Sequence, residues 1–173
     1  MRGARIGVPV LLAVAIGGFV PGPETMGETG PEGPGAFEGT WSASGRRFTV
    51  PTEGGGLAGV VQVSGSIVLA GVEGLGWGFR GEAIGYDDGD RLSVGRAVWT
   101  DERGDRIFSR LEGERLEAGR RATGTFTGGT GRYAGLTGSY VFEWRYFVDA
   151  EDGEVHGLAV RLRGRARLAE PSR

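Results

Sequence analysis

The chain has 173 residues, 36 of them Gly, and its 20 basic residues nearly balance its 22 acidic ones, for a formal net charge of −2. Every basic residue is Arg, and the sequence contains no Lys, no Asn, no Cys and one His. This composition excludes a P-loop, a Schiff-base lysine, a thiol nucleophile, a disulfide and a His or Cys metal cluster, so we expect neither a metal nor a cofactor. The Arg residues are dispersed and the pI is near 5.6, which argues against a nucleic-acid partner.

The first 20 residues have the pattern of a secretory signal peptide. Two Arg residues precede an apolar run over 6–20. The run is shorter than the roughly 20 residues of a membrane span, and Pro9 interrupts it. We therefore predict export to the periplasm or the extracellular space, with an uncleaved membrane anchor as the alternative. Residues 21–35 are rich in Pro and Gly and predict a flexible linker, and residues 169–173 form a short tail.

Between residues 36 and 168 the sequence alternates with period two and predicts a single β domain. Connections rich in Gly and Asp-Gly, which suit tight turns, separate the apolar runs. The first predicted strand is interrupted near Ser44-Gly45. The eight predicted strands cover 37–50, 58–70, 76–86, 91–100, 106–112, 120–127, 138–148 and 155–168.

Strands that follow one another through short turns predict an up-and-down antiparallel meander. Closing such a meander removes its exposed edges, and eight strands leave room for packed side chains or for one small ligand. Glycines within the strands permit the sharp coiling that a small barrel needs. The predicted fold class is therefore all-β, with one eight-stranded antiparallel up-and-down barrel over 36–168.

The alternation also divides each strand into two faces. In 138–148 an aromatic face opposes a face that carries Glu143 and Arg145. The last strand sets Leu158, Val160 and Leu162 against a row of Arg residues. We expect the apolar faces to fill the barrel and the charged faces to meet water. If the Glu143 side pointed inward instead, the barrel would enclose a polar site. The aromatic face consists of Tyr140, Phe142, Trp144 and Tyr146.

Three short motifs are better explained by turns than by chemistry. Residues 129–134 read G-x-G-x-x-A, but a strand rather than the required phosphate-binding helix follows them. Residues 87–90 read DDGD and lack the ligand spacing of a calcium loop. Residues 103–105 read RGD between two predicted strands, where the same residue types form an ordinary polar turn.

The glycine-rich segment before the aromatic strand also resembles a known signature. It reads Gly128-Gly129-Thr130-Gly131-Arg132-Tyr133-Ala134-Gly135, and Gly138 follows. This run is similar to the GGTG-x-[FY]-x-G signature of the allene oxide cyclase and dirigent barrels. The likeness extends upstream to residues 89–94 and downstream through the last two predicted strands to Leu168. The chain thus resembles a bacterial, secreted member of this superfamily.

The resemblance implies a homotrimer and an apolar lumen. Allene oxide cyclases cyclise an unsaturated fatty-acid epoxide in that lumen, whereas dirigent proteins orient phenolic radicals without covalent chemistry. The cyclase site relies on a water held by Asn and on a carboxylate. Because this chain contains no Asn, the resemblance assigns no catalytic residue here.

The leading hypothesis for function is non-catalytic binding of a small apolar or amphipathic molecule in the barrel. The ligand would be held by aromatic side chains near the barrel mouth, and the candidates are Trp77, Phe79, Trp99 and Tyr146. An enzyme is the first alternative: an isomerase or cyclase that uses a lumen carboxylate with Arg as its electrostatic partner.

The catalytic candidates are Glu82, Glu143 and Arg145, and Glu82 with Glu143 is the one cross-strand carboxylate pair to test. Salt bridges on the outer face, which are routine in β-sheets, are the favoured explanation of these residues. The other alternative is a structural barrel that is solidly filled and oligomerises through its outer aromatic residues. Contact with a membrane is expected only through the N-terminal segment, if it stays uncleaved.

Overall fold

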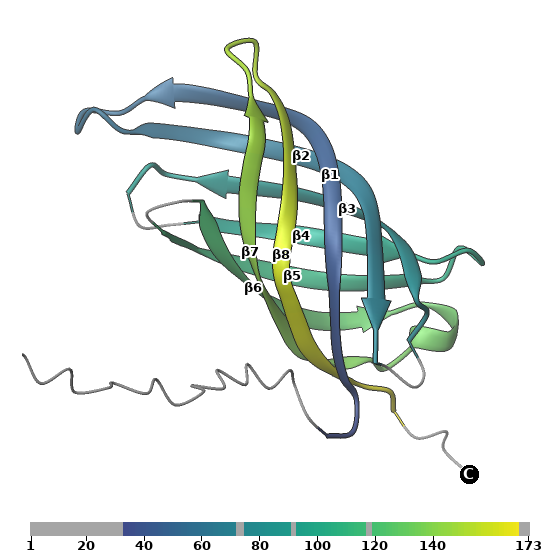
Figure 1. Cartoon of the computed structure of the whole chain (residues 1–173). Helices are drawn as coiled ribbons and strands as arrows, with labels where there is room; N and C mark the ends of the chain where they lie inside the picture. Colours follow the sequence, from purple (N-terminus) through teal and green to yellow (C-terminus); the bar gives the residue numbers. More distant parts are fainter. Residues whose placement is uncertain (1–32, 72–74, 91–92, 117–118, 170–173) are drawn as a thin grey trace, which may run out of the picture.

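A computed structural model describes residues 33–71, 75–90, 93–116 and 119–169 (Figure 1). The predicted signal peptide, nearly all of the predicted linker and most of the tail lie outside the described residues. The described residues form β-strands, connecting turns and one short 3-10 turn, Gly131–Tyr133, labelled η1.

Eight antiparallel strands pair in chain order, and β1 also pairs with β8, so the sheet closes on itself. Figure 1 shows the strands wrapping round a common interior. The closed eight-stranded antiparallel barrel predicted from the sequence is therefore confirmed. The strands are β1 (Ala36–Pro51), β2 (Leu57–Ala70), β3 (Gly78–Asp87), β4 (Ser93–Thr100), β5 (Arg106–Arg115), β6 (Arg120–Gly129), β7 (Thr137–Asp149) and β8 (Glu154–Arg167).

The predicted interruption of the first strand is wrong, because β1 pairs with β2 without a break through Ser44 and Gly45. Glycine permits a very close approach of the two backbones here. A Cβ at Gly45 would lie 1.8 Å from the carbonyl oxygen of Gln62, and one at Gly65 would lie 1.9 Å from that of Ser42. The glycines therefore bend the β1–β2 pair without ending either strand.

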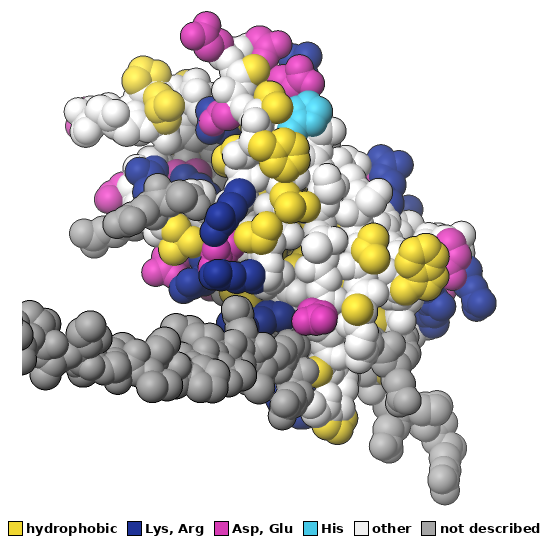
Figure 2. All heavy atoms as spheres, in the orientation of Figure 1, with side chains coloured by type: hydrophobic (Ala, Val, Ile, Leu, Met, Phe, Trp, Pro, Cys, Tyr) yellow, Lys and Arg dark blue, Asp and Glu magenta, His cyan; other side chains and the backbone are white. Residues whose placement is uncertain are grey.

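The aromatic face of β7 points into the barrel, as the alternation predicted. Tyr140, Phe142 and Trp144 are buried, whereas Glu143 and Arg145 lie on the outer face. On the part of the outer surface seen in Figure 2, basic and acidic side chains lie among scattered apolar ones. The charged faces of the strands therefore meet solvent.

The predicted faces of the last strand are correct only in its second half. Leu162 is buried, but Leu158 and Val160 lie half-buried, while Val155 and Ala159 are buried instead. The reason is a bulge. On β1, Gly39 pairs with Leu162 and Trp41 with Ala159, so β8 carries one extra residue over this interval. Arg161 has φ 54° there, and the extra residue exchanges the two faces of the strand.

The two ends of the barrel differ. The β1–β2 and β7–β8 turns lie at one end, at the upper left of Figure 1, together with the adjoining ends of β3 to β6, while η1 and the β4–β5 turn lie at the other. Tightly packed aromatic rings fill the η1 end. The indole of Trp99 lies 4.8 Å from the ring of Tyr140 and 5.5 Å from that of Phe126, between centroids. We call these the mouth and the closed end.

Candidate functional site

The half of the barrel nearer the mouth is not filled. It contains a cavity of about 110 Å³ whose wall is almost entirely apolar. Inward-facing positions of β2 to β5 carry small or branched residues there, and the large rings come from β1 and β7. Side chains that form the wall include Trp41, Val63, Ala83, Leu111, Ala122 and Trp144.

A second hollow, of about 350 Å³, lies at the mouth. Residues from β2, β3, β4, β6 and β7 line both spaces, which makes the hollow and the cavity continuous. The shared residues are Val61, Gly85, Ser93, Arg120 and Tyr146. The site is therefore one chamber that is apolar inside and polar at its opening, the usual design of a small-molecule pocket.

Ion pairs hold the charged side chains of the mouth. Arg120 forms an ion pair with Asp87, and the Nη2 atom of Arg115 lies 4.0 Å from the Oδ1 atom of the same carboxylate. Arg115 also donates a hydrogen bond to the carbonyl oxygen of Gly89 at 3.1 Å. On the opposite side, Arg47 pairs with Asp149 at 2.6 Å. Asp87 ends β3 and Arg120 begins β6, which are not paired strands, so their ion pair reaches across the opening of the barrel, at whose rim these groups lie.

Tyr146 lies between the two halves of this rim. The guanidinium carbon of Arg47 is 5.8 Å from the centroid of its ring. Burial raises the pKa of the Tyr146 phenol, and the positive charges of Arg47 and Arg120 oppose that rise. The phenol therefore stays protonated at neutral pH and offers a hydrogen-bond donor at the opening.

The structure separates the four aromatic residues that were expected to hold a ligand together. Tyr146 lines the chamber. Phe79 and Trp99 contact each other, with ring centroids 5.8 Å apart, but they lie in the packed closed end and are absent from the chamber wall. Trp77 precedes β3 and is 76% exposed. Aromatic residues nearer the mouth, Trp41 and Trp144, line the cavity instead.

The expected carboxylate pair does not exist, because Glu82 lies on β3 and Glu143 on β7, which are not neighbours in the barrel. Both are also on the outer face. Glu82 pairs with Arg80 at 3.0 Å, and Glu143 pairs with Arg145 at 3.4 Å and with Arg161 at 3.2 Å. Burial tends to raise the pKa of Glu143, but these two arginines bring it below its usual value. These residues therefore form surface ion pairs outside the lumen.

The charged residues of the mouth were missed in the sequence. Asp87 was assigned to a turn and Arg120 only to the start of a strand. A signal was present, because Asp87 follows Phe79 and Ala83 at even spacing and Arg120 stands two residues before Ala122. Residues of one parity on a strand share a face. Both side chains could thus have been placed in the lumen once the barrel was expected.

The glycine-rich segment 128–135 closes the other end of the barrel. Tyr133 and Leu136 are fully buried beneath it, and Gly128, Gly131 and Gly135 have positive φ values. Because η1 is a single turn and β7 follows, the segment presents no long helix to a dinucleotide phosphate. The motif therefore shapes a plug, in agreement with its interpretation as a structural element.

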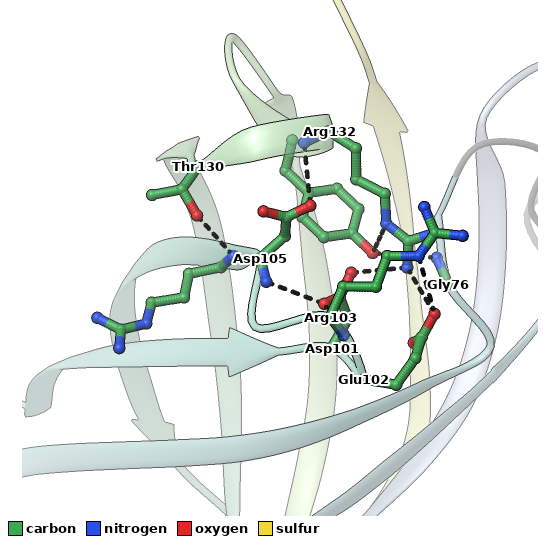
Figure 3. A network of polar contacts seen from close by, with 9 residues as sticks. Gly76, Asp101, Glu102, Arg103, Asp105, Thr130 and Arg132 are labelled. Atoms are coloured by element: carbon green, nitrogen blue, oxygen red, sulfur yellow. Dashed lines mark hydrogen bonds and ion pairs between the residues drawn. The ribbon is translucent and has the colours of Figure 1, made fainter.

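A polar network ties this plug to the β4–β5 turn (Figure 3). The Oδ1 atom of Asp101 accepts hydrogen bonds from the backbone N–H groups of Arg103 and Asp105, at 2.8 and 2.9 Å. Its Oδ2 atom pairs with the Nη2 atom of Arg132 at 2.7 Å. Arg132 Nε donates to the hydroxyl of Tyr133 at 2.9 Å. The RGD tripeptide is thus part of an ordered turn at the closed end.

No protein family model, no curated protein and no solved structure matches the chain. Within the described ranges, no group of three or more His, Asp and Glu side chains is placed to hold a metal ion. The same residues contain no helix that is long and apolar enough to span a membrane. The chamber is therefore the feature of the described structure that indicates a function.

Proposed function

We propose that the protein is exported and binds a small apolar or amphipathic molecule in the open half of its barrel, without chemistry of its own. The observation that carries this proposal is the apolar cavity joined to a polar mouth. An evenly packed barrel would fill this space with side chains, as the closed end does. Here, small residues on β3 and β6 leave it empty, while large rings enclose it.

Two features of the sequence support the proposals of export and of kinship with a known superfamily. The pattern of residues 1–20 favours export, and the segment 128–135 favours kinship with the allene oxide cyclase and dirigent barrels. The closed eight-stranded barrel is compatible with that kinship. The proposal of binding rests on the chamber and stands independently of both features.

Filling the cavity tests the proposal. Ala122 points into the lumen, and its replacement by Trp is expected to reduce binding of the neutral one-ring probe toluene by at least about tenfold, because the new ring occupies the probe's space. The full-length chain is titrated with toluene, and the heat of binding is measured by isothermal titration calorimetry.

The matched control is Thr123→Trp. Thr123 follows Ala122 on β6 and is exposed on the outer face of the barrel, so the same ring is added outside the lumen. This variant should bind the probe as the unaltered protein does. Equal binding by the unaltered protein and the Ala122→Trp variant, with both variants folded, would reject the lumen as the binding site.

If the protein is an isomerase instead, its catalytic carboxylate is a different residue from those expected. Asp87 lines the mouth with Arg120 and Arg115 beside it, so a lumen carboxylate with an Arg partner exists, although it is neither Glu82 nor Glu143. A general acid or base must reach the reacting group. Only a ligand that extends from the cavity to the rim would bring its reacting atom there.

An oligomeric barrel is a second candidate that a specific observation favours. An apolar row crosses the outer face of four strands: Phe48 pairs with Val60, Val60 with Tyr86, and Tyr86 with Val94. Phe48 is 66% exposed and Tyr86 44% exposed. Contiguous exposed apolar surface is typical of association sites. A homotrimer, as the superfamily resemblance implies, would cover such a row.

Native mass spectrometry of the full-length chain checks this candidate. Trimers are expected for the unaltered protein, and Tyr86→Glu should shift the population to monomers because it places a charge in the middle of the apolar row. Glu112→Gln, at the end of the same cross-strand row, is the control and should stay trimeric. A monomeric unaltered protein would contradict the oligomeric function and leave the binding proposal intact.

A further inference from the structure

We propose that the mouth of the barrel is an anion site, and that the ligand is a small monoanion, such as a carboxylate, which carries an apolar group no larger than about one ring. This inference rests on the proposed function and specifies the class of ligand. Three observations support it: the position of Arg120 between the cavity and the mouth, the charges of the rim and the volume of the cavity.

Arg120 stands where the apolar and polar parts of the chamber meet. Among the described residues that line the apolar cavity it alone is charged, and it also lines the mouth. Its strand position explains this, because Arg120 pairs in register with Trp144, whose ring forms part of the cavity wall. A ligand whose apolar end contacts Trp144 would therefore place its polar end beside the guanidinium.

The rim carries more positive than negative charge. Arg47, Arg115 and Arg120 line the mouth, and Asp87 is the one carboxylate among the described residues that line it. Asp149, which does not line the mouth, neutralises Arg47. Asp87 is shared by Arg115 and Arg120. One carboxylate between two guanidinium groups leaves a positive charge that a bound anion would balance.

The guanidinium groups also have hydrogen-bond donors to spare. A guanidinium has five N–H donors in a planar fork. Arg120 contacts Asp87 through one nitrogen, and its side chain remains 28% exposed. Arg–carboxylate pairs are commonly bidentate, and charge-assisted hydrogen bonds of this kind are stronger than neutral ones. The phenol of Tyr146, which lines the same opening, supplies a further donor.

The cavity limits the apolar part of the ligand. An apolar cavity of about 150 Å³ is enough to bind benzene. The cavity here measures about 110 Å³, and the rings of Trp41, Phe142 and Trp144 bound it on the side of β1 and β7. A single ring or a short branched chain would occupy it with its polar end in the mouth, whereas a long chain would find the closed end already packed.

Competition among three ligands that share one phenylbutyl skeleton and differ only in charge tests the proposal. Toluene bound to the full-length protein is displaced by 4-phenylbutyrate, 4-phenyl-1-butanol and 4-phenylbutylamine in separate calorimetric titrations. The carboxylate is expected to compete about tenfold better than the alcohol, and the amine worst. Octadecanoate should compete no better than hexanoate.

Two substitutions at the mouth should act in opposite directions. Arg120→Gln should weaken competition by 4-phenylbutyrate about tenfold and leave that of the alcohol unchanged. Asp87→Asn should strengthen competition by the carboxylate, because it removes the anion that Arg120 and Arg115 already hold. Arg121→Gln, at the adjacent outward-facing position, is the control and should change neither value.

The outcomes separate this inference from the function on which it rests. Equal competition by the carboxylate and the alcohol, or an unchanged carboxylate preference in Arg120→Gln, would overturn the anion site although the probe still binds. Failure of the probe to bind the unaltered protein would overturn the proposed function itself. A preference for octadecanoate would overturn the limit on the size of the apolar group.

Discussion

Replacing Trp99 with Ala is expected to lower the free energy of unfolding by about 3–5 kcal/mol, the usual cost of truncating a large aromatic side chain in a core. Trp99 is 1% exposed and lies at the centre of the closed end. Its ring contacts those of Phe37, Phe79 and Tyr140, with centroids 6.2, 5.8 and 4.8 Å away. Removal of the indole therefore leaves a cavity that these rings cannot fill without moving.

Denaturant unfolding followed by circular dichroism measures this loss. Trp77→Ala is the matched control, because Trp77 is exposed and its truncation should change stability by no more than about 0.5 kcal/mol. Trp99→Phe keeps a ring and provides a folded variant for binding studies. It should bind toluene normally, since Trp99 does not line the chamber. Loss of binding in folded Trp99→Phe would return Trp99 to the site.

Replacing Asp101 with Ala is expected to cost about 3 kcal/mol, because the change leaves several donors unsatisfied in a buried place. The Asp101 side chain is fully buried. Without it, the N–H groups of Arg103 and Asp105 lose their acceptor. Arg132 keeps its ion pair with Glu102, at 3.5 Å, but loses the one with Asp101. The link between the β4–β5 turn and the plug would be weakened. Asp101→Asn keeps one acceptor oxygen and should cost less, about 1–2 kcal/mol.

The contribution of the Asp101 charge should depend on pH in a defined direction. Burial tends to raise its pKa, but the hydrogen bonds from Arg103 and Asp105 and the charge of Arg132 bring it below the ordinary value of 3.8. A carboxylate with a depressed pKa in the folded state stabilises that state above its unfolded pKa, and the contribution is lost as the pH falls through the folded pKa.

The stability difference between the unaltered protein and Asp101→Asn should therefore be constant well above pH 3.8 and shrink below it. Urea unfolding at a series of pH values measures it. A difference that grows on acidification would mean that the Asp101 charge does not stabilise the folded protein.

Much of the fold could be predicted because it depends on local rules. Period-two alternation placed eight strands, glycine and aspartate marked the turns between them, and short connections required antiparallel neighbours. The inward aromatic face of β7 followed from the same alternation. Local rules failed at the bulge of β8, because one extra residue at Arg161 exchanges the faces of Leu158 and Val160 without any mark in the hydrophobic pattern.

The site was harder to predict than the fold. Sequence alternation correctly gave Tyr146 an inward side chain, but it could not tell that Phe79 and Trp99 belong to the closed end and Trp41 and Trp144 to the cavity. Height along the barrel axis depends on the register of each strand against its neighbours, and no single strand encodes that register.

The sequence by itself thus determined a single all-β barrel without Lys or Cys chemistry, because composition and periodicity are properties of the chain alone. Only the tertiary structure decided that Glu82 and Glu143 lie far apart on the outer face and that Asp87, Arg115 and Arg120 share a rim. Asp87 and Arg120 lie on β3 and β6, which are not paired, and they meet across the opening because the sheet closes on itself when β1 pairs with β8. Which side chains meet across the lumen, and how much of it stays unfilled, follows from that closure.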